Sequence, residues 1–503
     1  MKLYKFITFA FIGLFLLSAC SEDYLEADNT GVLDSEKASE LAAQDPESLN
    51  AYLRGVWAFM VAYNISGSSV AVHDDFSYMS VLHAKDMMCE DIVMMSIHWF
   101  NYDYDVNNRI YTNRRPIIDW RVFYTMIAKA NEIIGFFPEE PVSVSSKGLL
   151  GQGYAIRGMA YYYLIQIFQN PTGADGLPNL SAPGVPMLYC AVDNMSEEEQ
   201  TRRKGRNTVK EVYDQIESDL TNAVKYLEAG YDRDEDKMFI DESVANGLLA
   251  RYYLLSQQWE KAAEAAKNAH AGYVIMGESG LHDGFMDITN GEWMWGFDHS
   301  TETQTTYASF FSHISNIAPG YAGIGYSPRG IDARLYSQIP SGDYRKALFN
   351  GPSGNPSAST SAAKLPYASL KFGDLGDWTM DYVYMRAAEM VLIEAEAYAH
   401  LGRGAEAATA LKKLMAKRDP QWNETSVTVD DVYLQRRIEL WGEGFCYFDL
   451  KRLNRGVDRN YAGSNHTTGY KHVIDAQDVA WIYQIPNAEM QENKQISKNE
   501  QNP

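Results

Sequence analysis

The sequence contains few cysteines, and none of them has the spacing of a disulfide-bonded or zinc-binding domain. Only four cysteines occur in 503 residues, and no CxxC pair is among them. Apart from Cys20, which is discussed below, the thiols are Cys89, Cys190 and Cys446, an odd number. We therefore expect no disulfide framework, no metal site and no cofactor in this protein.

Clusters of basic residues are also absent. The formal net charge is −22, with 44 lysines and arginines against 66 aspartates and glutamates. Because the binding of phosphate backbones draws on clustered Lys and Arg, nucleic acid is excluded as a partner. An acidic balance of this size is more typical of a well-solvated exterior than of a cation site.

No linker rich in Pro, Gly and Ser divides the chain into separate domains. The nearest candidate, Gly351–Ala363, is expected to be a surface loop. With 46% hydrophobic residues the chain can bury a large core. We expect residues 43–503 to form one domain, in which a helical scaffold carries a lobe of loops.

The amino terminus carries an apolar run with a positively charged start. Lys2 and Lys5 precede Phe6–Leu17, which is too short to span a bilayer stably but has the length of a secretory signal. Leu17-Ser18-Ala19-Cys20 follows and resembles the bacterial lipobox, in which small residues precede a cysteine that receives a diacylglycerol. The alternative is an ordinary secretory signal with an incidental cysteine. We expect removal of residues 1–19 as a signal peptide.

Lipidation of Cys20 would anchor a soluble body to a membrane without a transmembrane helix. Each buried CH₂ of an acyl chain contributes about 0.8 kcal/mol, so a multiply acylated cysteine is a durable anchor. Ser21-Glu22-Asp23 resembles the acidic surface-export signal of Bacteroidetes lipoproteins. We therefore expect residues 20–42 to be a lipidated tether that holds the body on the outside of the cell outer membrane.

Residues 245–269 predict two antiparallel helices. Apolar side chains recur at three- and four-residue steps in each half: Ala245, Leu248, Tyr252 and Leu255, then Trp259, Ala262, Ala266 and Ala269. The alanines allow the two helix axes to lie close together. Ala395–Leu414 repeats the scheme, and Ala155–Leu164 offers a further first helix. The pattern resembles a divergent tetratricopeptide repeat, so we expect a mostly α fold built on helical hairpins.

Two long stretches lack this periodicity. The segments at about 64–113 and about 273–378 are predicted to be loop-rich insertions. Within the second segment, Glu292–Phe297 is expected to be a short strand whose alternate residues lie on opposite faces. Further helices are expected over Pro46–Tyr63, capped by Asp45, over Ile117–Phe137, over Thr208–Tyr226 and from Asp430 or Asp431 to about Trp441. The charged segment Glu197–Lys204 is expected to be a solvated loop.

Three segments carry a family resemblance. Residues 436–452, RRIELWGEGFCYFDLKR, resemble the C-terminal signature of the SusD/RagB family of outer-membrane nutrient-binding lipoproteins. Arg206–Ala223 looks like the central helix of that family, and Ile485–Glu489 with Gln501–Pro503 looks like its ending. Cys446 stands where the family commonly has arginine, so an ion pair of that position with a glutamate such as Glu443 or Glu439 is in doubt. We expect this motif to be structural.

The resemblance implies a function as well as a fold. It implies a surface-exposed, lipid-anchored protein of the outer membrane that binds a glycan or oligosaccharide and delivers it to a TonB-dependent, SusC-like transporter. Such proteins bind and are not enzymes. Peptide cargo, which related systems also handle, stays open.

Two loop stretches offer the residue types that sugar recognition uses, namely an aromatic face and polar groups for hydroxyls. The first contains Trp99, Asn101 and Tyr102, which His73 and Asp75 are expected to join. The second contains Tyr307, Tyr321 and Tyr326. For each aromatic residue the alternative is packing against the helical scaffold.

Two other functions are compatible with the sequence. A scaffold that binds only the transporter would use the hairpins for protein contacts and would leave recognition of sugar to other proteins. A glycoside hydrolase would need two carboxylates about 5 Å or about 6.5–9.5 Å apart across a cleft. No motif in the chain singles out such a pair, and the pattern lacks the alternating strands and helices of a catalytic barrel.

Overall fold

The computed structural model describes residues 40–41, 44–190, 193 and 195–503. The predicted signal peptide, Cys20 and residues 20–39 of the predicted tether lie outside the described residues. In the part of the chain that the structure describes, no helix combines the length and the apolar character that crossing a bilayer requires.

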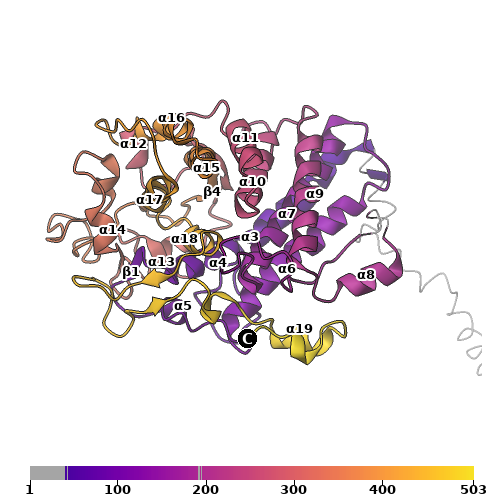
Figure 1. The fold of residues 1–503 in the computed structure, drawn as a ribbon, viewed down its shortest axis with the longest axis horizontal. Coiled ribbons are helices and arrows are strands. Elements are labelled where there is room, and N and C mark those ends of the chain that lie inside the picture. The colour runs from indigo at the N-terminus through magenta and orange to yellow at the C-terminus, as the bar shows by residue number, and fades with distance from the viewer. Residues whose placement is uncertain (1–39, 42–43, 191–192, 194) are drawn as a thin grey trace, which may run out of the picture.

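A row of helices forms one side of the molecule. In order across the row, each packed on the next, these are α6 (Arg114–Gly135), α7 (Val144–Phe168), α9 (Val209–Leu227), α10 (Glu242–Leu255), α11 (Trp259–Ala269), α15 (Ala387–His400) and α16 (Gly404–Met415). Figure 1 shows this row running from α6, α7 and α9 through α10 and α11 to α15 and α16. The predicted mostly α, hairpin-based fold is therefore confirmed.

Small residues let the helices of the row approach each other. Ala262, Ala266 and Ala269 of α11 are buried, and Ala407 of α16 repeats this arrangement in the second hairpin. A Cβ on Gly247 would lie 2.4 Å from the Met385 sulfur, so a larger residue where α10 meets the strand before α15 would displace the Met385 side chain. The two predicted hairpins are thus held by close packing of helix axes.

Loops, short helices and three two-stranded antiparallel sheets make up the rest. The shorter helices are α3 (Asn50–Met60), α4 (Tyr78–Met87), α5 (Asn101–Tyr104), α8 (Glu197–Arg203), α12 (Glu278–Leu281), α13 (Phe310–Ile314), α14 (Ala333–Ser337), α17 (Val429–Glu439), α18 (Cys446–Arg452) and α19 (Asn487–Glu492), with 3₁₀ turns η2 (Pro46–Leu49), η4 (Tyr344–Leu348), η5 (Val479–Trp481) and η6 (Lys498–Glu500). The sheets pair β1 (Ile92–Met94) with β3 (Arg329–Ile331), β2 (Trp293–Phe297) with β4 (Tyr382–Arg386), and β5 (Val457–Asp458) with β6 (Val473–Ile474).

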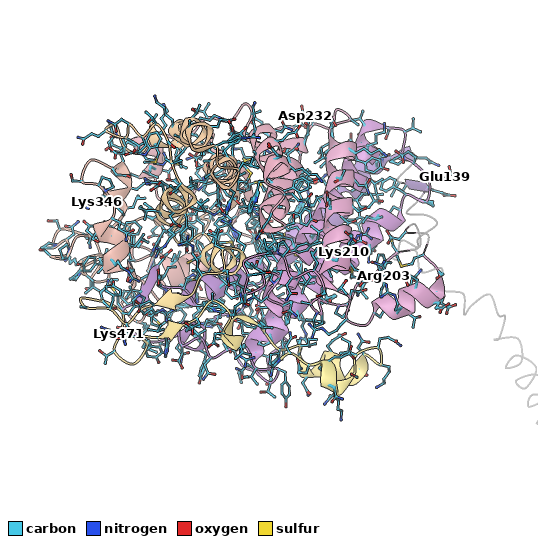
Figure 2. The ribbon with its side chains drawn as sticks, in the orientation of Figure 1. Glu139, Arg203, Lys210, Asp232, Lys346 and Lys471 are labelled. Atoms are coloured by element: carbon cyan, nitrogen blue, oxygen red, sulfur yellow. The ribbon has the colours of Figure 1, made fainter. Side chains whose placement is uncertain are left out.

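The loop-rich part lies beside the row and is joined to it through the core. In Figure 1, β1, α13 and α14 lie at the opposite end of the molecule from α8 and α9. One hydrophobic cluster nevertheless contains buried residues from Leu49 to Ile496. Charged side chains lie around the exterior, with Lys346 at the end formed by the loops and Glu139 at the other (Figure 2). The insertions therefore share one hydrophobic core with the helices.

Three expectations about local structure need correction. The stretch 64–113 contains α4, a helix whose ten residues are all buried, so it shows no polar face that would reveal its period. The segment predicted as a solvated loop is α8, which begins with a side-chain cap from Ser196 and is solvated as a helix. The helix after Asp45 is divided into η2 and α3, and the Asp45 side chain makes no cap. The predicted short strand is observed as β2, and all five of its residues are buried.

The helix at residue 208 begins as predicted. Thr208 accepts a hydrogen bond from the backbone N–H of Glu211, whose carboxylate accepts one in return from the Thr208 N–H. This reciprocal cap satisfies two backbone donors that would otherwise lack a partner. The predicted helix to Tyr226 is observed as α9.

Candidate ligand-binding site

Aromatic rings from the two predicted loop stretches meet in one cluster around Tyr321. The Tyr321 hydroxyl lies 2.6 Å from His73 Nδ1, although the two residues are 248 positions apart in the chain. The His73 ring is stacked on Tyr307, with centroids 6.1 Å apart, and lies 5.7 Å from Trp99. We call this cluster the aromatic platform; its members are His73, His98, Trp99, Tyr307, Tyr321 and Tyr326.

His98 belongs to the platform but was not singled out from the sequence. Its ring lies against both Tyr321, at 4.9 Å, and Tyr326, at 5.4 Å, and those two rings are 6.4 Å apart, so the three form a triangle. The signal that could have identified His98 is its position immediately before Trp99 in irregular chain. Beneath the platform, the buried His313 stacks on Tyr321 at 5.1 Å, and its Nε2 lies 2.6 Å from the His73 carbonyl oxygen.

The platform is open to solvent on its outer side. Tyr307 is 44% exposed and Tyr326 is 58% exposed, while His73, Trp99 and Tyr321 are half-buried. Phe100, with φ of 68°, turns the chain so that its own ring is buried in the core, whereas the neighbouring Trp99 stays half-buried. Exposed apolar rings held in place by buried neighbours form a surface against which the apolar face of a sugar can stack.

Three imidazoles in and beneath the platform have lowered pKa values. Burial lowers the pKa of His83, His98 and His313, and the nearby guanidinium of Arg329 lowers it further in each case. Arg329 is itself buried, which lowers its pKa to about 9, and it makes no ion pair among the described residues. His98 on the platform and the buried His83 and His313 are therefore uncharged at neutral pH.

Three predicted site residues lie outside the platform. Asp75 is fully buried, because its carboxylate accepts hydrogen bonds from the Ser66 N–H at 2.8 Å and the Ser66 hydroxyl at 2.6 Å. Its expected contact with a ligand is therefore wrong for this structure. Asn101 and Tyr102 are in α5; Asn101 is half-buried, whereas Tyr102 is 61% exposed and lines a separate cavity. The two loop stretches thus supply His73, Trp99, Tyr307, Tyr321 and Tyr326 to one place.

A second polar region, deep in the molecule, has the opposite character. It contains Glu292, Lys371, Arg386, Arg418, Glu439 and Glu443, all buried, and we call it the buried charge network. Glu439 binds Arg386 at 2.7 Å and Arg418 at 2.9 Å. Burial alone would raise the pKa of its carboxyl, but the positive charges of these guanidiniums outweigh burial and hold the pKa well below the usual range. Glu443 binds Arg386 at 2.8 Å and Lys371 at 2.5 Å.

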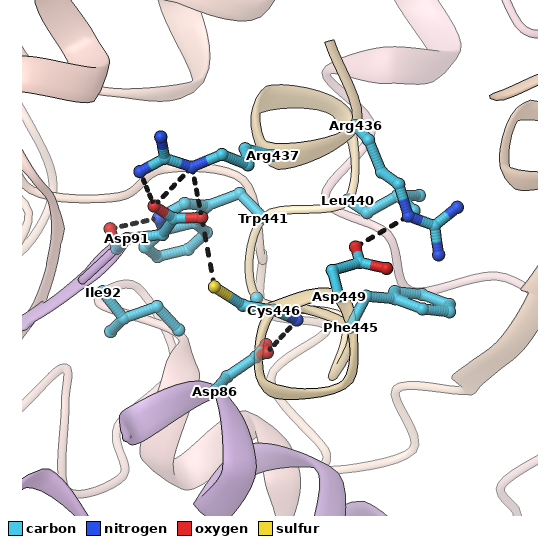
Figure 3. Close-up of a pocket in the computed structure, with 11 residues that line it drawn as sticks. Asp86, Asp91, Ile92, Arg436, Arg437, Leu440, Trp441, Phe445, Cys446 and Asp449 are labelled. Carbon is cyan, nitrogen blue, oxygen red and sulfur yellow. Dashed lines mark hydrogen bonds and ion pairs between the residues drawn. The ribbon is translucent and has the colours of Figure 1, made fainter. Parts of the chain in front are cut away.

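The network explains why the family-like motif tolerates a cysteine. Glu439 and Glu443 find their cations elsewhere, so neither needs a basic residue at position 446. The Cys446 thiol instead lies 3.4 Å from Asp91 Oδ2, and Arg437 binds the same carboxylate (Figure 3). This region connects α4 to α17 and α18 and is structural, as predicted.

A buried carboxylate lies in the same place. Asp86 accepts hydrogen bonds from the backbone N–H groups of Cys446, at 3.1 Å, and of Gly444, at 2.7 Å. Gly444 adopts φ of 92°, and a Cβ there would lie 2.5 Å from Leu82, so a side chain at 444 would disrupt this contact. Burial raises the pKa of Asp86 to about 7. The cavity between these residues, about 10 Å³, has room for about one water molecule.

Comparisons with known families match two parts of the chain. Residues 34–254 match the family described as "Starch-binding associating with outer membrane". Residues 368–503 match the SusD family. SusD-like protein P2 of Formosa agariphila is 23% identical over 385 residues, which cover 67% of this chain and 71% of the relative.

Solved structures are similar over almost the whole chain. A SusD-like carbohydrate-binding protein from Bacteroides vulgatus has a TM-score of 0.75 and 25% identity, covering 90% of this chain and 98% of its own. A laminarin-binding SusD-like protein has a TM-score of 0.65 and 18% identity, covering 91% of this chain and 99% of its own. The arrangement of helices and loops described above is thus shared with solved proteins.

Proposed function

Because the chain belongs to the SusD/RagB family, we propose that it is a cell-surface lipoprotein that binds a glycan on its aromatic platform and delivers it to a transporter. The observation that carries this proposal is the platform itself, in which exposed tyrosine rings and half-buried His73 and Trp99 form one surface. The binding of carbohydrate by a relative of the same fold, and of laminarin by another, supports a sugar as ligand.

Trp99→Ala tests the platform directly. Removal of the indole takes away a large apolar face beside His73, so glycan affinity is expected to fall about tenfold or more. The ligand is first found on a glycan array and the affinity then measured by calorimetry. Trp259→Ala is the matched control, because Trp259 is also half-buried but stacks on His400 in the helical row.

Two outcomes would contradict this proposal. Equal losses of affinity in both variants would mean that a general loss of structure, and not the platform, causes the effect. A large fall in thermal stability of Trp99→Ala alone would assign Trp99 to the core. If the purified wild-type protein released new reducing ends from polysaccharides, its function would be hydrolysis and not binding alone.

The proposed place of action is the outside of the outer membrane, beside a TonB-dependent, SusC-like transporter. The lipobox-like sequence ending at Cys20 and the match to a family associated with the outer membrane support this location. Purification of the tagged protein from detergent-solubilised outer membranes should recover the transporter. Recovery of the transporter together with no signal on a glycan array would favour the scaffold function instead.

A further inference from the structure

A cavity of about 600 Å³ opens beside the aromatic platform and takes no part in the function proposed above. Its walls include Asp74, Tyr102, Asn107, Asn108, Asn113 and Arg114. The volume is within the range of pockets that hold small ligands. No residue of this cavity belongs to the platform, so it is a separate site.

The cavity and the platform are built from the same two stretches of chain. Asp74 follows His73 directly, so their Cα atoms are about 3.8 Å apart. Tyr102 lies in α5, which begins in a turn closed by a hydrogen bond from the Asn101 N–H to the His98 carbonyl at 3.1 Å. A chain of sugars lying on His73 and Trp99 therefore needs only a short extension to reach the cavity.

The lining of the cavity is polar but has no net charge. Arg114 Nη2 donates to both oxygens of Asp74, at 2.8 and 3.0 Å, so these two charges neutralise each other. Three asparagines, Thr112, Ile110 and the exposed ring of Tyr102 complete the walls. Amides, a paired carboxylate and guanidinium, and one aromatic face are the groups that recognise the hydroxyls and the apolar face of an uncharged sugar.

One side-chain donor in the cavity wall lacks an acceptor in the described part of the chain. Arg114 Nε is shielded from solvent and has no hydrogen-bond partner among the described residues. Asn113 is at the N-cap position of α6 but does not cap it; its amide donates to the Asn107 carbonyl oxygen at 3.4 Å. The first backbone N–H groups of α6 at this wall are therefore left for water or for a ligand.

We propose that this cavity is a second sugar subsite, which receives the units of an uncharged oligosaccharide that extend past the platform. The inference rests on the proposed function and adds a ligand class and a minimum length to it. Short oligosaccharides occupy the platform alone, whereas longer ones gain hydrogen bonds in the cavity. Affinity should therefore rise with chain length and then level off.

Calorimetry with laminari- and malto-oligosaccharides, from disaccharide to heptasaccharide, tests the subsite. Tyr102→Ala and Asn107→Ala change exposed side chains, so both variants should keep the wild-type melting temperature. Each variant should bind the disaccharide as the wild type does and bind the heptasaccharide about fivefold to tenfold more weakly. Trp99→Ala should weaken binding at every length.

The possible results separate the two proposals. If both cavity variants bind every length like the wild type, the subsite is wrong while the platform stands. If Trp99→Ala has no effect and the cavity variants lose the disaccharide, the platform is wrong and the cavity is not a second subsite. Binding of acidic polysaccharides without binding of either uncharged series overturns the ligand class. Absence of binding to any sugar overturns the proposed function and this inference together.

Discussion

The buried charge network and the aromatic platform differ in the burial and the pairing of their polar groups. In the network each carboxylate has cations within hydrogen-bonding distance, and all six side chains are buried. On the platform, rings are partly exposed, and the His98 Nδ1 has no partner among the described residues. Satisfied, enclosed charges hold a fold together, whereas partly exposed rings are available to a ligand.

Glu439→Ala is the strongest test of the network. The substitution leaves Arg386 and Arg418 buried with fewer counter-charges, so we expect the free energy of unfolding to fall by about 3–5 kcal/mol. Urea denaturation followed by circular dichroism measures this change. A loss below about 1 kcal/mol would mean that the network contributes little to stability, and the contrast with the platform would fail.

Asp86, which lies in the buried structural region, should make the stability of the protein depend on pH. Its pKa is about 7 in the folded protein against 3.8 as the ordinary value, so the folded state binds more protons between these pH values. The contribution of Asp86 to the free energy of unfolding is therefore fully present below about pH 4 and is lost as the pH rises through about 7. The free energy of unfolding falls by at most about 1.4 kcal/mol per pH unit in this window. Asp86→Asn should flatten the plot of unfolding free energy against pH over this window. Parallel curves for the two proteins would contradict the assignment.

Tyr321→Phe sharpens the platform side. The variant keeps the ring and removes only the hydroxyl that bonds His73 at 2.6 Å. We expect a loss of stability of about 1 kcal/mol and a fewfold weaker affinity for the glycan, since His73 is then less well oriented. Thermal melting and calorimetry on the same samples measure both. Loss of most of the stability would place Tyr321 with the core and not with the platform.

Lys210→Ala is expected to have the smallest effect on stability, and it serves as the reference for an exposed ion pair. Lys210 and Asp214 form an ion pair on the surface of α9 at 2.7 Å, and both side chains are 61% exposed. Because solvent screens such a pair, the change in unfolding free energy should be at most about 0.5 kcal/mol. Denaturation at low and high salt checks it, and a larger effect would show that surface charge matters as much as buried charge.

The helical row could be predicted because its physical cause is local. Alanines at helical spacing in 245–269 and 395–414 indicate which helix faces pack against each other. This pattern can be recognised without knowing any distant contact. Helix α4 could not be found in this way, since burial of every residue removes the contrast between faces. Helix α8 was missed for the opposite reason, because none of its residues is buried.

The candidate site was predictable in its residue types and not in its assembly. Trp99 and Tyr321 were selected as rings in irregular chain, which is a local property. Their meeting depends on the pairing of Ile92 with Ile331 in β1 and β3, and a three-residue strand carries too little pattern to specify a partner so far along the chain. The prediction for Asp75 was wrong because its loop folds back, so that the carboxylate is buried and accepts hydrogen bonds from Ser66.

The distance along the chain between the contributors to the platform has a practical consequence. No fragment that ends before Tyr321 can present the complete surface, so a sugar bound there recognises only the finished fold. By mass action such a sugar raises the melting temperature of the whole protein in proportion to the logarithm of its concentration above the dissociation constant. A thermal-shift screen with unlabelled oligosaccharides is therefore enough to search for the natural cargo.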